Sequence, residues 1–110
     1  MKSLTDTFKL YNDVEIPCVG LGTWQSTDET AKNAVLSALS LGYRLIDTAA
    51  AYGNERGVGA GVNASGLKRE EIFVTSKLRN AHHGYKATLE AFEGTMERLG
   101  LEYLDLYLIH

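Results

Sequence analysis

Residues Leu45–Glu55 read LIDTAAAYGNE, and the rest of the chain is arranged around this segment. A short apolar run ends at the carboxylate of Asp47, and three alanines then lead to Tyr52 and a Gly-Asn-Glu sequence. A short apolar run followed by small and polar residues is typical of a strand that opens into a loop. The segment therefore predicts an acid and a phenol close together at one end of a sheet.

Further apolar segments flank this junction and predict the other strands of the sheet. With the junction's own strand, they cover residues Val19–Trp24, Tyr43–Thr48, Ile72–Leu78 and Leu104–His110. The turn signal Asn12-Asp13 within Phe8–Pro17 predicts a β-hairpin in front of them.

Helical segments separate the predicted strands. The first carries apolar residues at i, i+3 and i+4 spacing between a capping box, Ser26 to Glu29, and a terminating glycine, Gly42. The third covers Tyr85–Leu99 and ends at Gly100. A mixed-charge stretch, Lys-Arg-Glu-Glu at 68–71, predicts a solvated link into the third strand.

The second helix is predicted over Asn54–Asn63 and contains Gly57, Gly59 and Gly61. Each glycine costs about 1 kcal/mol relative to alanine inside a helix. The glycines also suggest a dinucleotide-binding loop, but Val62 stands where the third glycine of that motif belongs. A helix weakened by glycine is the better interpretation.

Alternating strands and helices, with strands apolar enough to be buried on both faces, indicate an α/β fold with a parallel sheet. Asp47 and Lys77 lie 30 residues apart, and Lys77 and His110 lie 33 residues apart. Eight units of this length give the roughly 250 residues of a (β/α)8 TIM barrel. The chain therefore matches half a barrel: a hairpin, four parallel strands and three helices.

The composition excludes several classes of protein. With 110 residues, 45% hydrophobic and 23% charged, the chain is one globular domain or part of one. Its net charge of −3 and lack of basic clusters argue against a nucleic acid or membrane partner, and its apolar runs are too short to span a bilayer. A single cysteine, Cys18, allows no internal disulfide, and no ligand partner is spaced for His82-His83, so no metal is expected. We expect a cytoplasmic protein.

The residues that point to chemistry share one position in the fold. Asp47, Lys77 and His110 each end an apolar strand, and Tyr52 follows one. The carboxyl ends of the strands are where active sites form in barrels and open α/β sheets. Any one of these residues alone has a simpler explanation in a cap, an ion pair or packing, so the hypothesis depends on the set.

Together the four residues predict a proton donor. Free tyrosine is too weak an acid to protonate an alkoxide readily at neutral pH, and a neighbouring ammonium group favours its phenolate. An aspartate would keep that ammonium charged, and a histidine could donate to a substrate carbonyl or relay the proton. This combination suits carbonyl reduction, in which a cofactor supplies hydride.

Four blocks of sequence resemble the signatures of the aldo-keto reductases, in the same order along nearly the whole chain. They are VGLGTW (19–24), GYRLIDTAAAYGNE (42–55), REEIFVTSKL (69–78) and LGLEYLDLYLIH (99–110). The resemblance implies a (β/α)8 barrel closed at its base by the amino-terminal hairpin. It also implies reduction of an aldehyde or ketone with NADPH, less often NADH. Its catalytic tetrad falls on Tyr52, Asp47, Lys77 and His110, with Tyr52 as the general acid.

The same resemblance assigns binding residues. Gly22, Thr23, Trp24 and Asp47 match cofactor contacts, and the substrate pocket would include Trp24, Tyr52, Arg79 and His110. Many prokaryotic members carry tryptophan in place of Arg79, which predicts a more cationic pocket rim and a preference for acidic or polyhydroxylated carbonyls.

The family pattern continues beyond His110 with four more strands, which carry most of the cofactor contacts. We therefore expect residues 1–110 to be the amino-terminal half of one barrel domain, with weak or no NAD(P)H binding alone. Four parallel strands leave two unpaired edges and an uncovered face, so a missing carboxyl-terminal half or a second copy should close the barrel. The alternative is a catalytically inactive half-barrel that serves as a binding or assembly module.

Overall fold

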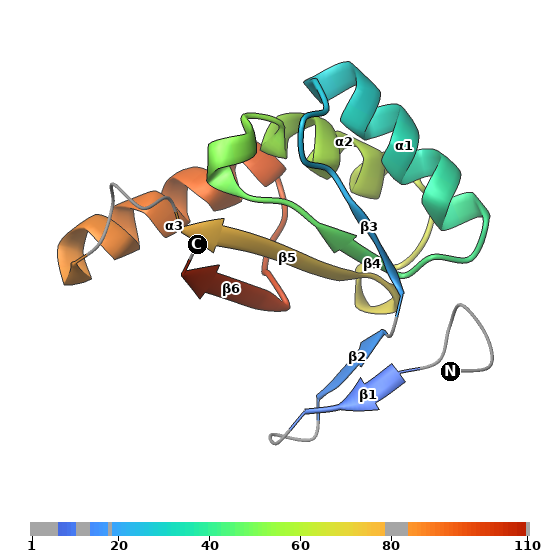
Figure 1. Cartoon of the computed structure of the whole chain (residues 1–110), viewed down its shortest axis with the longest axis horizontal. Helices are drawn as coiled ribbons and strands as arrows, with labels where there is room; N and C mark the ends of the chain where they lie inside the picture. Colours follow the sequence, from blue (N-terminus) through green and yellow to red (C-terminus); the bar gives the residue numbers. More distant parts are fainter. Residues whose placement is uncertain (1–6, 11–13, 18, 79–83, 110) are drawn as a thin grey trace.

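The computed structural model describes residues 7–10, 14–17, 19–78 and 84–109. Its first two strands, β1 (Thr7–Lys9) and β2 (Glu15–Pro17), pair antiparallel with Phe8 opposite Ile16. This pairing confirms the predicted hairpin strands, and the predicted turn at Asn12-Asp13 lies outside the described residues. Figure 1 shows it at the amino-terminal end of the next strand, clear of the main sheet.

The main sheet has four parallel strands in the order of the sequence, as predicted. They are β3 (Gly20–Gly22), β4 (Leu45–Asp47), β5 (Phe73–Leu78) and β6 (Leu106–Ile109). Each strand is shorter than the apolar segment that predicted it. The register places Asp47 beside Gly22 on one neighbour and beside Thr75 on the other.

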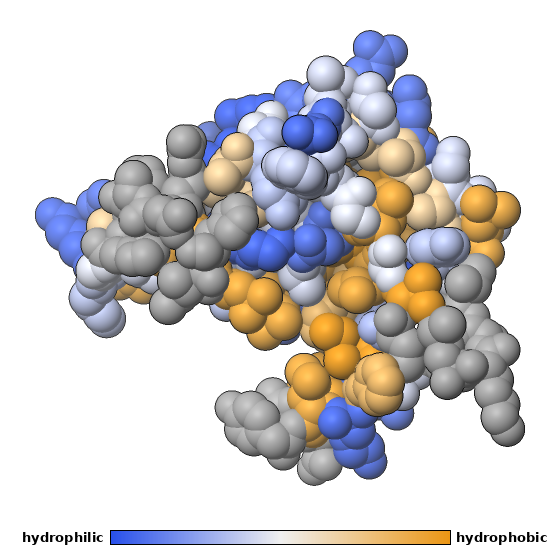
Figure 2. Space-filling view, in the orientation of Figure 1, coloured by the Kyte–Doolittle hydropathy of each residue, from blue (hydrophilic) through white to orange (hydrophobic). Residues whose placement is uncertain are grey.

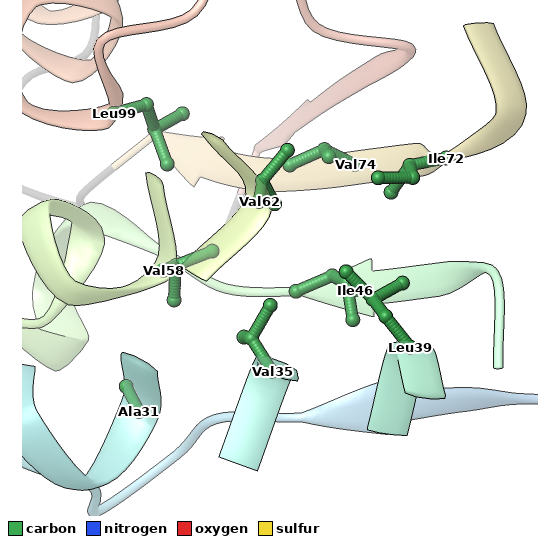
Figure 3. Packing of buried hydrophobic residues seen from close by; sticks show 9 residues of the cluster. All are labelled: Ala31, Val35, Leu39, Ile46, Val58, Val62, Ile72, Val74 and Leu99. Carbon is green, nitrogen blue, oxygen red and sulfur yellow. The ribbon is translucent and has the colours of Figure 1, made fainter. Parts of the chain in front are cut away.

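The three helices lie on one side of this sheet (Figure 1). They are α1 (Asp28–Ser40), α2 (Glu55–Ala64) and α3 (Tyr85–Leu99). Their apolar faces meet the sheet in a core of fully or nearly buried residues, shown in Figure 3: Ala31, Val35, Leu39, Ile46, Val58, Val62, Ile72, Val74 and Leu99.

The sheet has a second face, which the helices do not cover. Side chains alternate along a strand, so Ile46 and Val74 point to the helices while Asp47 and Thr75 point the other way. Leu108 of β6 is 41% exposed. Figure 2 shows hydrophobic surface over the strands and beside the hairpin on the side drawn. The polar residues at the strand ends therefore lie at the edge of a partly apolar face.

The start of α1 differs from the sequence prediction. The helix is capped by Thr27, whose hydroxyl accepts a hydrogen bond from the Thr30 amide at 3.2 Å, so the predicted box from Ser26 to Glu29 is wrong by one residue. Ser26 is already engaged in the preceding turn, because its amide donates to the Thr23 carbonyl. The predicted ends of α1 and α3 are confirmed, since glycines with positive φ follow each helix.

The glycines of α2 have a structural reason. A Cβ on Gly57 would overlap the backbone of Asp28 at the start of α1, and a Cβ on Gly59 would lie 2.7 Å from Leu99 Cα in α3. Carbon atoms in contact normally stand about 3.5–4.0 Å apart. Glycine therefore lets α2 pack closely between the other two helices.

The predicted solvated link at residues 68–71 is wrong for Arg69. The link contains a 3-10 turn, η2 (Arg69–Glu71), and the Arg69 guanidinium bonds the Asp105 carboxylate at 2.9 Å and the Tyr103 carbonyl at 2.8 Å. Asp105 also accepts a hydrogen bond from the Val74 amide. This cluster fastens the start of β5 to the segment that enters β6.

In the part of the chain that the structure describes, no helix is long and apolar enough to cross a membrane.

Candidate active site

The candidate site lies at the carboxyl ends of β3, β4 and β5, which meet at one edge because the strands are parallel. Asp47 is the last residue of β4, and Lys77 stands near the end of β5. The β4 strand stops where the chain turns into η1 (Ala50–Tyr52), a single 3-10 turn that the sequence did not predict. This turn brings Tyr52 back beside the strand ends.

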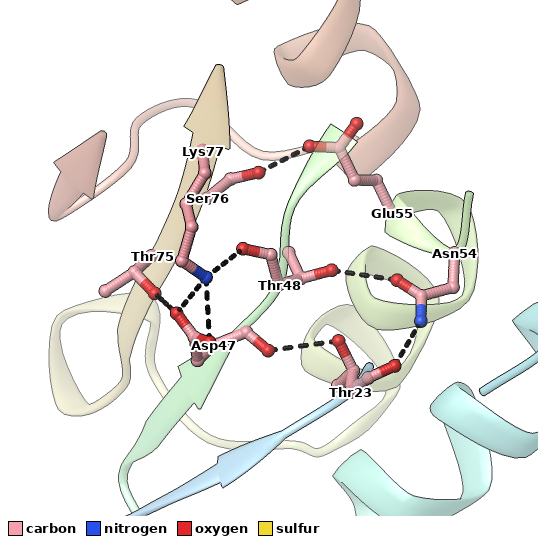
Figure 4. Close-up of polar contacts among 8 residues, drawn as sticks. All are labelled: Thr23, Asp47, Thr48, Asn54, Glu55, Thr75, Ser76 and Lys77. Carbon is pink, nitrogen blue, oxygen red and sulfur yellow. Dashed lines mark hydrogen bonds and ion pairs between the residues drawn. The ribbon is translucent and has the colours of Figure 1, made fainter. Parts of the chain in front are cut away.

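Lys77 and Asp47 form a close ion pair (Figure 4). The Lys77 ammonium donates to both Asp47 carboxylate oxygens at 2.8 Å and to the Thr48 carbonyl at 3.1 Å. These three bonds match the three donors of an ammonium group. The Thr75 hydroxyl donates to the same carboxylate. The Lys77 side chain is 16% exposed and that of Asp47 is 37% exposed. Hydrogen bonds therefore hold the pair in place, while the carboxylate stays accessible to solvent or a ligand.

Tyr52 lies within reach of the same charge. The Lys77 Nζ stands 5.2 Å from the centre of the Tyr52 ring, inside the range of a cation–π contact. Gly53, with φ of 73°, ends the turn and directs the chain into α2. An acid, an ammonium and a phenol from two strands and one loop are thus brought together.

The segment after β3 borders the same edge. The buried Thr23 donates its hydroxyl and its amide to the Asp47 carbonyl, at 3.0 and 3.1 Å. Trp24 is 69% exposed. The space in front of Gly22 is open, because a Cβ there would meet nothing within 4 Å. The open backbone at Gly22 and Thr23 therefore borders Asp47, and Trp24 is the next residue.

Two predicted site residues, Arg79 and His110, lie outside the described residues. The histidine pair at 82–83, which was not expected to bind metal, also lies outside them. Among the described residues, no group of three or more His, Cys, Asp or Glu side chains is placed to hold a metal ion.

Sequence reasoning assigned no role to Asn54, the residue before α2. Its side chain is fully buried and does not cap the helix. Instead its amide accepts a hydrogen bond from the Thr48 hydroxyl at 2.8 Å and donates to the carbonyls of Thr23 and Ser26 at 2.6 and 3.1 Å. The sequence placed Asn54 only as the first residue of the predicted second helix, and nothing in the sequence pattern signals this bridge between loops.

Glu55 was missed in the same way. Its side chain is 1% exposed and accepts hydrogen bonds from the Ser76 hydroxyl at 2.6 Å and from Arg98 Nε at 2.8 Å. Because Ser76 precedes Lys77 on β5, the bonds of Glu55 to Ser76 and Arg98 fasten the site strand to α2 and α3.

Tyr107 lies on the helical side of the sheet. Burial raises the pKa of Tyr107 above the ordinary value, and the Glu55 charge adds to the effect.

A cavity of about 470 Å³ also lies on the helical side, lined by residues that include Gly53, Arg56, Glu90 and Arg98. Its lining does not include Asp47, Tyr52 or Lys77. The candidate site is therefore the edge of the sheet and not this cavity.

Comparison with known proteins decides the family. The family model of the aldo/keto reductases matches residues 18–110. This chain belongs to the aldo/keto reductase family. It is 55% identical to the glyoxal reductase of Bacillus subtilis (strain 168) over 109 residues, covering 98% of this chain and 40% of that protein. It is 57% identical to the 9,11-endoperoxide prostaglandin H2 reductase of Trypanosoma cruzi (strain CL Brener) over 103 residues, covering 92% of this chain and 36% of that protein.

Solved aldo/keto reductases show the same fold. An enzyme from Brucella melitensis superposes with a TM-score of 0.94 at 50% identity, covering 96% of this chain and 40% of that one. A Bombyx mori aldo-keto reductase in complex with NADP gives 0.90 at 42% identity, covering 96% and 38%. The chain thus spans about 40% of the length of these relatives. Its hairpin, four parallel strands and three helices form half of a (β/α)8 barrel, as the sequence predicted.

Proposed function

We propose that this chain provides the acid–base side of an NAD(P)H-dependent enzyme that reduces an aldehyde or ketone to an alcohol. The observation that carries the proposal is the Lys77 ammonium, which bonds both oxygens of Asp47 and stands 5.2 Å from the Tyr52 ring. A structural ion pair alone does not need a phenol beside it at the carboxyl edge of a parallel sheet. Membership of a reductase family supports the same reaction.

Each residue has a separate task in this proposal. Asp47 keeps Lys77 charged and in place, since a partly buried ammonium is stable only with a partner. The positive charge of Lys77 favours the phenolate that Tyr52 becomes when it donates its proton. Tyr52 gives that proton to the carbonyl oxygen while the carbonyl carbon receives hydride, so the products are an alcohol and a phenolate. His110 is assigned to orient the carbonyl on its sequence position alone.

The hydride would come from NADPH or NADH, which supplies two electrons to the carbonyl carbon when bound. The site has features that fit a nicotinamide nucleotide. Asp47 keeps 37% of its side chain exposed, so its carboxylate can accept a further hydrogen bond from a ribose hydroxyl. The open space in front of Gly22 offers room for the nucleotide, and the exposed Trp24 offers an aromatic surface. NADP in the Bombyx mori enzyme supports the phosphorylated nucleotide.

A small carbonyl compound is the proposed substrate, in line with the glyoxal reductase to which the chain is similar. Arg79 directly follows β5, and a cationic group there would favour acidic or polyhydroxylated carbonyls. We place the enzyme in the cytoplasm on its cysteine content, which stays a prediction.

We also propose that residues 1–110 are the first half of one barrel domain, which a carboxyl-terminal half or a second copy must close. Within the described residues, β3 and β6 are the edges of the sheet, and the uncovered face exposes Leu108. Unpaired edges and an apolar face favour association. Intact mass and light scattering test this, and a stable monomer of the 110-residue chain would contradict it.

A chimera tests the function itself. This chain would replace the matching 40% of the Bacillus subtilis glyoxal reductase, leaving the rest of that enzyme to complete the barrel. We expect the chimera to consume NADPH with glyoxal, and its Lys77→Met variant to lose most of the turnover because Asp47 and Tyr52 lose their shared cation. A folded chimera that binds NADPH and reduces no carbonyl compound would favour the inactive-module alternative.

A further inference from the structure

Trp24 is presented by a tight turn, Thr23–Ser26. The Ser26 amide donates to the Thr23 carbonyl at 3.2 Å, which closes a four-residue β-turn. Gln25, the third residue of this turn, has φ of 65° and is the only non-glycine residue with positive φ among those the structure describes. Such a turn normally takes glycine at its third position. A strained conformation persists only where its surroundings hold it.

Asn54 holds both ends of this turn by hydrogen bonds. The same side-chain nitrogen donates to the carbonyls of Thr23 and Ser26, the first and last residues of the turn. The side-chain oxygen of Asn54 accepts from the Thr48 hydroxyl, which fixes the orientation of the amide. Asn54 is 0% exposed, and Figure 4 shows its bonds to Thr48 and Thr23.

The other end of this bridge touches the proposed catalytic pair. Thr48 follows Asp47, and its carbonyl accepts a hydrogen bond from Lys77 Nζ. Asn54 therefore joins the turn that carries Trp24 to the backbone that positions Lys77. Trp24 itself is 69% exposed, so the backbone of the turn, and not core packing, sets where its side chain starts.

We propose that Asn54 is a positioning residue: it holds the Thr23–Ser26 turn in its strained form and so sets the place of Trp24, which directly follows the residue bonded to Asp47. This assignment rests on the proposed function for its meaning in catalysis, since Trp24 would border the bound carbonyl compound. Asn54 would act on substrate selection through Trp24 without touching substrate.

The placement of Trp24 can be measured without any turnover, because Trp24 is the only tryptophan in the chain. Time-resolved fluorescence anisotropy then reports the local motion of this one side chain. The test variant is Asn54→Asp, which keeps an acceptor for Thr48 but loses both donors to the turn. A protonated aspartic acid regains one O–H donor.

We expect Asn54→Asp to show a larger amplitude of fast Trp24 motion at neutral pH, which falls again on acidification. Wild type should show no such pH response. Asn63→Ala is the matched control, because Asn63 is an exposed asparagine of α2, the helix that follows Asn54, and it donates to the carbonyl of Gly100 instead. It should leave the Trp24 signal unchanged.

A second variant covers the case in which Asn54→Asp does not fold. Thr48→Val removes the hydroxyl that orients the Asn54 amide, so it should loosen Trp24 in the same direction and to a smaller extent. Folded variants whose Trp24 anisotropy matches wild type would overturn the proposal. Loss of far-UV circular dichroism in both variants would also overturn it, because Asn54 would then serve stability and not placement. Neither result depends on whether the chain reduces carbonyl compounds.

Discussion

Substituting Gly59 by alanine should destabilise the protein, although the residue is in a helix. Helix propensity alone predicts a gain of about 1 kcal/mol for glycine to alanine. The structure predicts the opposite, because α2 passes so close to the end of α3 that a Cβ on Gly59 would lie 2.7 Å from Leu99 Cα and would overlap the Leu99 carbonyl. The obstacle is backbone, which cannot rotate away as a side chain can.

The cost follows from the separation that the new methyl group requires. Carbon contacts need about 3.5–4.0 Å and the Leu99 carbonyl is nearer than Cα, so the helices must part by more than about 1 Å. Overpacking of this kind costs about 1–3 kcal/mol, and a backbone obstacle puts it at the upper end. After subtracting the propensity gain, we expect a net loss of about 2 kcal/mol.

Gly94→Ala in α3 is the matched control. A Cβ there would come within 3.0 Å only of Arg98 Nη1, the free end of a long side chain, which needs to shift by a few tenths of an ångström and is not the nitrogen that bonds Glu55. This variant should therefore gain up to about 1 kcal/mol. Urea unfolding followed by circular dichroism would show the Gly59→Ala midpoint below wild type and the Gly94→Ala midpoint at or above it. If both alanines stabilise the protein equally, the close packing of α2 against α3 is wrong.

Three further predictions concern the polar groups. Glu55→Gln should lower the free energy of unfolding by about 2 kcal/mol, less than the 3–5 kcal/mol of a fully buried pair because Arg98 is 37% exposed; the exposed Glu90→Gln is the control, and equal urea midpoints would refute the role of Glu55. Burial raises the pKa of Tyr107, so the unfolded chain loses this proton first. The contribution of Tyr107 to the free energy of unfolding should be fully present below pH about 10 and should fall as the pH rises above it. Tyr107→Phe should remove part of that fall. A urea midpoint with the same pH profile in this variant as in wild type would contradict the prediction. In the chimera, Arg79→Trp should lower turnover of a keto acid relative to a neutral aldehyde, and an unchanged ratio would exclude Arg79 from substrate selection.

The arrangement of strands was predictable because it depends on simple periodic patterns. Alternating apolar strands and amphipathic helices allow few topologies other than a parallel sheet, and Asp47 and Lys77 at the ends of neighbouring strands had to meet at one edge. Tyr52 was predicted beside them because it follows the strand that ends at Asp47, and the family signatures matched the same residue. The 3-10 turn that brings Tyr52 back toward Lys77 has no distinct sequence pattern, so it was not predicted.

Contacts between distant segments could not be read from the sequence. Arg69 looked solvated because its neighbours are charged, yet it pairs with Asp105, which is 36 residues away. Asn54 and Glu55 looked like ordinary residues at a helix start, since polar groups there usually face solvent or cap the helix. Only the fold shows that both are buried, Asn54 against the segments after β3 and β4 and Glu55 against β5 and α3. The glycines of α2 were likewise a weakness in sequence terms and a requirement of packing in the structure.

The central claim is that Tyr52 is the proton donor in carbonyl reduction and that Lys77 and Asp47 serve it. The most direct measurement compares two variants of the chimera, Tyr52→Phe and the control Tyr43→Phe. Tyr43 lies just before β4, at the end of the strand away from Asp47. For each variant, turnover of glyoxal and the dissociation constant of NADPH would be measured. We predict that Tyr52→Phe abolishes turnover with NADPH affinity nearly unchanged, while Tyr43→Phe retains both. Turnover that survives in Tyr52→Phe would contradict the claim.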